Sequence, residues 1–191
     1  MRTRRIILLA AACFTYVVPA AGQMPRGSIS QAFTRIDDVR ANQYGICKTT
    51  KSFGDRDNPV LEQRCPSGPG GWPVTLNSAD ARSFVVFGRY AADGATVMDA
   101  LGGAFADPHN VIEWRSIDGR PFAAIQRYFF DGKQVLTVHR LNPDMTSCVA
   151  GLVAVAPGRD ANQEAVEIAD TVALHFRCGT DRLVAVGMPL S

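Results

Sequence analysis

Two Asp-Gly dipeptides separate three long β-type runs in the second half of the chain, and they constrain its fold more than any other feature. The runs cover residues 111–117, 121–130 and 134–141, with Asp118-Gly119 and Asp131-Gly132 between them. Asp-Gly accepts the positive φ angles of two-residue hairpin turns, so consecutive antiparallel strands are predicted. A fourth run over 148–155 is apolar throughout, as expected of a strand buried on both faces. Together these runs predict an antiparallel meander.

A helix is predicted after the meander. Asp160 can cap it, and Gln163 follows three residues later in the spacing of a capping box. An apolar stripe then recurs at helical spacing, through Val166, Ala169, Val172, Ala173 and Phe176. The helix is expected to end near Cys178-Gly179. With further strand candidates at 44–49, 60–65, 72–76 and 83–88, the fold class is α+β: an antiparallel sheet of about five to seven strands with a C-terminal helix packed on it.

The N-terminus has the pattern of an export leader. Three arginines precede an apolar run over residues 6–18, and small residues follow at 19–22. The apolar run is shorter than the roughly 20 residues that span a bilayer, which favours cleavage after Gly22 over membrane insertion. Residues 1–22 are therefore predicted to be a signal peptide, and residues 23–191 a single globular domain in the periplasm or the extracellular medium.

Four cysteines lie beyond this leader: Cys47, Cys65, Cys148 and Cys178. They allow three pairings, of which locality favours Cys47–Cys65 with Cys148–Cys178. The sequence has no CxxC motif and its three histidines are scattered, so structural disulfides are favoured over a metal site or a redox pair. No metal and no cofactor are expected.

Charge narrows the range of partners. The chain carries a net charge of +2, and removal of the leader with its three arginines leaves −1. No basic tract remains, which argues against nucleic acid or an anionic membrane surface as the partner. An envelope protein or a small ligand is the expected partner.

Counting across the two hairpin turns gives one polar constellation. Glu113 would face Ala124, and Ala124 would face His139 on the next strand; Arg115 would face Phe122. The polar face would hold Glu113, Arg115, Gln126, Tyr128, Thr137 and His139. Glu113 and His139 could act through a bound water as base and acid, and Arg115, Gln126, Tyr128 and Thr137 could contact a ligand. The alternatives are a solvated sheet face and a β-bulge that breaks the row.

Standard catalytic motifs such as GxSxG and HExxH are missing from the sequence. The leading hypothesis is therefore a non-enzymatic periplasmic binding or interaction module. One alternative is a small hydrolase that uses Glu113 and His139. Another is an inhibitor of a secreted enzyme, with the loop between Cys47 and Cys65 as its contact.

Several stretches resemble a group of small exported proteobacterial proteins with no established activity. They are Cys-Pro at 65–66 with Gly-Trp-Pro-Val at 71–74, Asp-Ala-Arg-Ser-Phe-Val at 80–85, Ile-Glu-Trp-Arg at 112–115 with Gly-Arg-Pro-Phe-Ala-Ala-Ile at 119–125, and Ile-Ala-Asp at 168–170 with Phe-Arg-Cys at 176–178. The resemblance implies a secreted or periplasmic single domain. It brings no activity or site residue to this chain.

Overall fold

The computed structural model describes residues 27–55 and 59–188. The strands are β1 (Ile29–Arg35), β2 (Lys48–Gly54), β3 (Pro59–Arg64), β4 (Val74–Ala79), β5 (Arg82–Phe87), β6 (Arg89–Tyr90), β7 (Asp107–Ile117), β8 (Arg120–Phe130), β9 (Lys133–Leu141), β10 (Thr146–Ala154) and β11 (Val184–Val186). The α-helices are α1 (Val97–Ala100) and α2 (Ala161–Thr171), and short 3-10 turns occupy Pro69–Gly71 and Ala173–His175. The predicted α+β class is confirmed.

The strands form two sheets rather than one. The larger has the order β1-β7-β8-β9-β10-β11, and the smaller has the order β2-β3-β4-β5. The antiparallel series β7-β8-β9-β10 confirms the predicted meander. The large sheet as a whole is mixed, because β6 and β11 both pair with β10 in parallel. A single antiparallel meander is therefore too simple, because β6 and β11 share the edge of β10 opposite β9, each running parallel to it.

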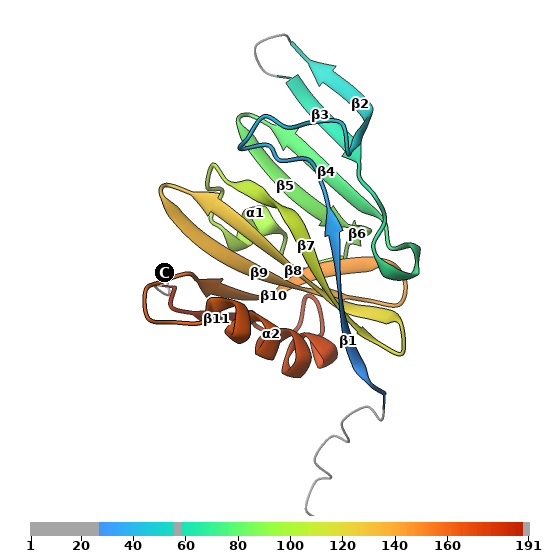
Figure 1. Ribbon diagram of the computed structural model, residues 1–191, viewed down its shortest axis with the longest axis vertical. Coiled ribbons are helices and arrows are strands. Elements are labelled where there is room, and N and C mark those ends of the chain that lie inside the picture. Colours follow the sequence, from blue (N-terminus) through green and yellow to red (C-terminus); the bar gives the residue numbers. More distant parts are fainter. Residues whose placement is uncertain (1–26, 56–58, 189–191) are drawn as a thin grey trace, which may run out of the picture.

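The two sheets and α2 are stacked as layers around the meander (Figure 1). One face of the large sheet packs against α2, through Ile125, Val138 and Ile168 among others. The opposite face packs against the small sheet, where Trp114 and Ala124 meet Leu76 in a second apolar cluster. Both faces of β7–β10 are thus buried, which explains the continuous apolar run of β10.

Both predicted disulfides are present. Cys47–Cys65 joins the chain just before β2 to the chain just after β3. Cys148–Cys178 ties β10 to the segment that follows α2, with Cα atoms 5.8 Å apart.

The C-terminal helix starts as predicted and ends earlier. Asp160 caps α2, its side chain accepting from the backbone N–H of Gln163 at 3.0 Å. The α-helix stops at Thr171, not near Cys178, and continues as a 3-10 turn. The Arg140 guanidinium donates to the carbonyl groups of Ala173 and Leu174 in this turn.

The predicted leader, residues 1–22, lies outside the described residues. Within residues 27–55 and 59–188, no helix is long and apolar enough to cross a membrane.

Candidate functional site

A β-bulge divides the predicted polar face between the two sides of the large sheet. Beside the Asp118-Gly119 turn, Ser116 pairs with Pro121, but Arg115 pairs with Ala123. Phe122 is the extra residue on β8, and it shifts the pairs of residues 112–115 on β7 by one position; a second register shift separates them from the Pro108–Tyr128 pair. The predicted Arg115–Phe122 pair is therefore wrong.

The same shift corrects the position of Glu113. Glu113 pairs with Ile125, and it is Trp114 that pairs with Ala124. The predicted Ala124–His139 pair is confirmed, because the Asp131-Gly132 hairpin has no bulge. Since side chains alternate between faces, Glu113 lies on the α2 side and His139 on the small-sheet side. The structure therefore does not bring the proposed base and acid together.

His139 is sealed between the two sheets. Its side chain is 0% exposed, and its ring lies edge-on to Phe87 with centroids 4.7 Å apart. Nε2 lies 2.9 Å from the Thr137 hydroxyl oxygen. Burial lowers the pKa of His139 to about 3, because the charged imidazolium would lose its hydration there. The imidazole is therefore neutral near pH 7 and has no contact with solvent.

Gln126 and Tyr128 also lie in this inter-sheet layer. Gln126 donates from Nε2 to the His109 carbonyl oxygen at 2.7 Å. The Tyr128 hydroxyl accepts from the backbone N–H of Val85 at 2.9 Å, and burial raises its pKa. These contacts join β8 to β7 and to β5. The predicted ligand contacts on this face are buried groups that brace the layer.

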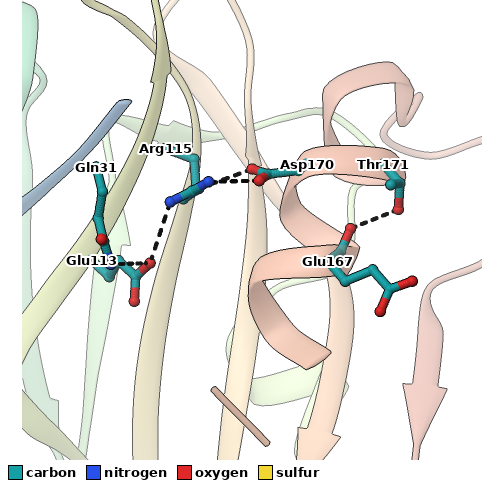
Figure 2. Close-up of polar contacts among 6 residues, drawn as sticks. All are labelled: Gln31, Glu113, Arg115, Glu167, Asp170 and Thr171. Atoms are coloured by element: carbon teal, nitrogen blue, oxygen red, sulfur yellow. Dashed lines mark hydrogen bonds and ion pairs between the residues drawn. The ribbon is translucent and has the colours of Figure 1, made fainter. Parts of the chain in front are cut away.

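Glu113 and Arg115 belong to a polar network between the sheet and α2 (Figure 2). Arg115 donates from Nε and Nη2 to the two carboxylate oxygens of Asp170, at 2.9 and 2.6 Å. Glu113 accepts from Gln31 of β1 at 2.8 Å and lies 3.9 Å from Arg115 Nη1. Desolvation raises the pKa of Glu113, while the Asp170 carboxylate raises the pKa of Arg115. The network connects β1, β7 and α2.

A cavity of about 220 Å³ lies beside this network, lined in part by Glu113, His109 and Arg127. Burial lowers the pKa of His109, and the nearby Arg127 lowers it further. Arg127 itself donates to Gln134 and to Asn162 of α2, at 2.7 Å each. The volume falls below the range of about 300–1,000 Å³ that is usual for small-molecule sites. The cavity is large enough for water and small ions.

The β2–β3 hairpin offers the most exposed surface of the small sheet. It stands at the end of the molecule farthest from α2 (Figure 1), and every residue of β2 is exposed. Three large apolar side chains in or next to β2 face solvent: Tyr44 at 60%, Ile46 at 46% and Phe53 at 60%. We call Tyr44, Ile46, β2 and β3 the hairpin surface.

The base of the hairpin is fixed by two interactions. One is the Cys47–Cys65 disulfide. The other is the buried Asp37 carboxylate, whose Oδ1 accepts from the backbone N–H groups of Ile46 and Cys47 at 2.7 and 3.0 Å. The surface is therefore presented by a braced element and not by a loose loop.

The sequence placed a possible contact between Cys47 and Cys65 but did not identify Tyr44, Ile46 or Phe53. A signal was available, since residues 48–52 read Lys-Thr-Thr-Lys-Ser and lack the apolar alternation of a half-buried strand.

Among the described residues, no group of three or more His, Cys, Asp or Glu side chains is arranged to hold a metal ion. The chain matches no protein-family profile, no curated protein and no solved structure.

Proposed function

We propose that this protein is an exported, non-enzymatic interaction module that binds a protein of the cell envelope through the hairpin surface. Two disulfides support an oxidising compartment, where such bonds form and persist. The leader pattern at residues 1–22 and the resemblance to exported proteobacterial proteins point the same way.

The observation that carries the proposal is the exposure of Tyr44, Ile46 and Phe53 on a braced hairpin. Aromatic residues often supply the buried anchors of an interface. Tyr44 precedes β2 and Phe53 lies near the far end of that strand, so the exposed aromatic side chains are spread along the hairpin. A disulfide-fixed element also loses little conformational freedom when it binds.

Recognition through side chains is favoured over addition of a strand to β2. The β2 edge carries Lys48 and Lys51, and a bulge interrupts its pairing at Thr50. Charged residues and bulges are common devices that prevent edge strands from pairing with other chains. The partner would therefore bury the apolar side chains, with the lysines near the rim.

An inhibitor of a secreted enzyme is a second candidate, because a projecting hairpin can enter a cleft. The two functions use the same surface and differ in the partner. If the partner is an enzyme, its activity should fall in proportion to the protein added. If the partner is not an enzyme, the inhibitor version fails.

Photo-crosslinking tests the contact. A photoreactive phenylalanine analogue is placed at Phe53 in one variant and at Phe105 in a control, since Phe105 is similarly exposed at 57% but lies outside the hairpin surface. We expect a discrete protein adduct in the envelope at Phe53 and not at Phe105. With the purified partner, Phe53→Ser should weaken binding at least tenfold, about 1.4 kcal/mol. Identical adducts at both positions, or unchanged affinity, would refute the proposal.

A further inference from the structure

A groove of about 800 Å³ opens where the β7–β8 turn and the β9–β10 turn meet the segment that contains Trp72, just before β4. Most of its lining is apolar, including Trp72, Ile117, Pro121, Phe122, Leu141 and Leu174. The volume is within the range of about 300–1,000 Å³ that is usual for small-molecule sites, and such sites combine apolar walls with a few polar groups. None of its lining residues belongs to the hairpin surface, so this site is independent of the proposed function.

Arg140 supplies a fixed positive charge in the groove. Its Nη1 donates to the carbonyl oxygens of Ala173 and Leu174 at 3.2 and 2.6 Å, and its Nε donates to Asn142 Oδ1 at 3.2 Å. All three acceptors are neutral. Across the described part of the chain, no carboxylate forms an ion pair with Arg140, and its Nη2 makes no hydrogen bond.

Among the described residues, this half-buried charge is compensated by neutral hydrogen-bond acceptors alone, and its Nη2 is not one of the buried polar atoms without a partner, so a ligand could reach it. Desolvation lowers the pKa of Arg140, which reflects the cost of holding the cation away from water. Buried charges in proteins are usually paired, because an unpaired one loses hydration without compensation. The two N–H groups of Nη2 are the remaining donors that an anion could use.

The rest of the lining adds one further positive and one negative group. Arg120 is exposed and, among the described residues, forms no ion pair. The negative group is Asp118. Its carboxylate lies close to Gly27, because a Cβ added to Gly27 would be 2.6 Å from Asp118 Oδ2. Two arginines and one aspartate leave the lining with a net charge of +1. A monoanion matches this balance better than a dianion such as a phosphate monoester.

We propose that the groove binds a small amphiphilic carboxylate, with its carboxylate on Arg140 and its apolar body against Trp72 and Phe122. The carboxylate would neutralise the unpaired guanidinium with charge-assisted hydrogen bonds. The apolar body would bury surface along the aromatic walls. Arg120, at the solvent side, adds a second cation whose contribution is screened by salt.

Calorimetric titration with decanoate below its micelle concentration tests the site, with decanol as the uncharged match. We expect decanoate to bind the oxidised full-length protein with a dissociation constant below about 1 mM, or better than −4 kcal/mol. Decanol should bind at least tenfold more weakly. Decyl phosphate should also bind more weakly than decanoate. Failure of decanoate to bind, or equal binding of decanol or decyl phosphate, would overturn the proposal.

Two variants locate the charge. Arg140→Gln should weaken decanoate binding at least tenfold, and its thermal unfolding should be recorded because Arg140 also holds the end of the α2 segment. Arg120→Glu lies on the exposed wall and keeps those contacts, and at low ionic strength, where screening is weak, it should weaken decanoate binding because the reversed charge repels the carboxylate. Arg35→Gln, an exposed change on β1 outside the groove, should leave binding unchanged. Normal binding by a folded Arg120→Glu variant would exclude this site.

Discussion

The Arg115 guanidinium binds the Asp170 carboxylate through two parallel hydrogen bonds of 2.9 and 2.6 Å, and so fastens α2 to β7. Both side chains are largely shielded, at 13% and 22% exposure. A two-point, shielded pair of this kind contributes more than a surface ion pair, because water and salt screen it less.

Asp170→Asn should therefore lower the free energy of unfolding by about 1–3 kcal/mol, since one charge-assisted hydrogen bond is lost and Arg115 remains shielded. Urea denaturation monitored by circular dichroism measures the change. Glu62→Gln is the control, because its pair with Lys51 lies at the surface and should have little effect on stability. An equal decrease in the free energy of unfolding in both variants would contradict the proposal that the Arg115–Asp170 pair anchors α2 to β7.

Acid should destabilise the protein through His139. Its folded pKa of about 3 lies below the unfolded value of about 6.5, so the unfolded chain binds the extra proton first as pH falls. The stability contributed by the neutral imidazole is complete above about pH 6.5 and is lost progressively down to about pH 3.

His139→Leu isolates this effect. Between pH 7.5 and pH 5.0 the wild type should lose about 2 kcal/mol more stability than the variant, whose other titrating groups are unchanged. Urea unfolding at the two pH values gives the difference. Parallel pH dependence in the two proteins would show that the pKa of His139 is the same in the folded and the unfolded chain.

The Cys148–Cys178 bridge closes a 30-residue segment around α2. Replacing both cysteines with alanine should cost about 3–4 kcal/mol, mainly through the entropy that the unfolded chain regains. In a variant that lacks the Cys47–Cys65 bridge, reduction of Cys148–Cys178 should lower the free energy of unfolding by a similar amount. A drop far smaller than this would mean that the α2 contacts alone hold the segment.

Asp37 is expected to control the order of the hairpin surface. Asp37→Ala removes the acceptor for two backbone N–H groups, at Ile46 and Cys47, and should lower the free energy of unfolding by about 1–3 kcal/mol. Asp37→Asn keeps one oxygen acceptor and should cost less. Limited proteolysis should cut the alanine variant faster near residues 44–54. Equal cutting of both variants would argue against this brace.

The sequence was sufficient for the elements whose signals are local. The Asp118-Gly119 and Asp131-Gly132 turns, with positive φ at all four residues, form hairpins because their backbone preference decides the conformation. The Asp160 cap and both disulfide pairings were predictable for the same reason, since each joins residues that are close in sequence or in one segment.

Features set by tertiary packing were not predictable. The extra residue at Phe122 has no turn signal of its own, because that side chain is drawn into the apolar cluster below α2. Because of this one extra residue, Glu113 and His139 lie on opposite faces of the large sheet, and the predicted polar face does not form. The small sheet was also missed as a separate layer, since a strand pattern does not state which sheet the strand joins.

The pairing of β1 with β7 sets an order for the folding of the chain. Ile29 lies opposite Ile117, and the whole small sheet is encoded between these strands. The entropic cost of closing so long a segment delays this contact relative to the short hairpins of β7–β10. A chain that emerges N-terminus first presents β1 long before its partner exists. The strand that comes first in the sequence then waits through the longest stretch of chain for its partner, and its edge needs protection from other chains until β7 arrives.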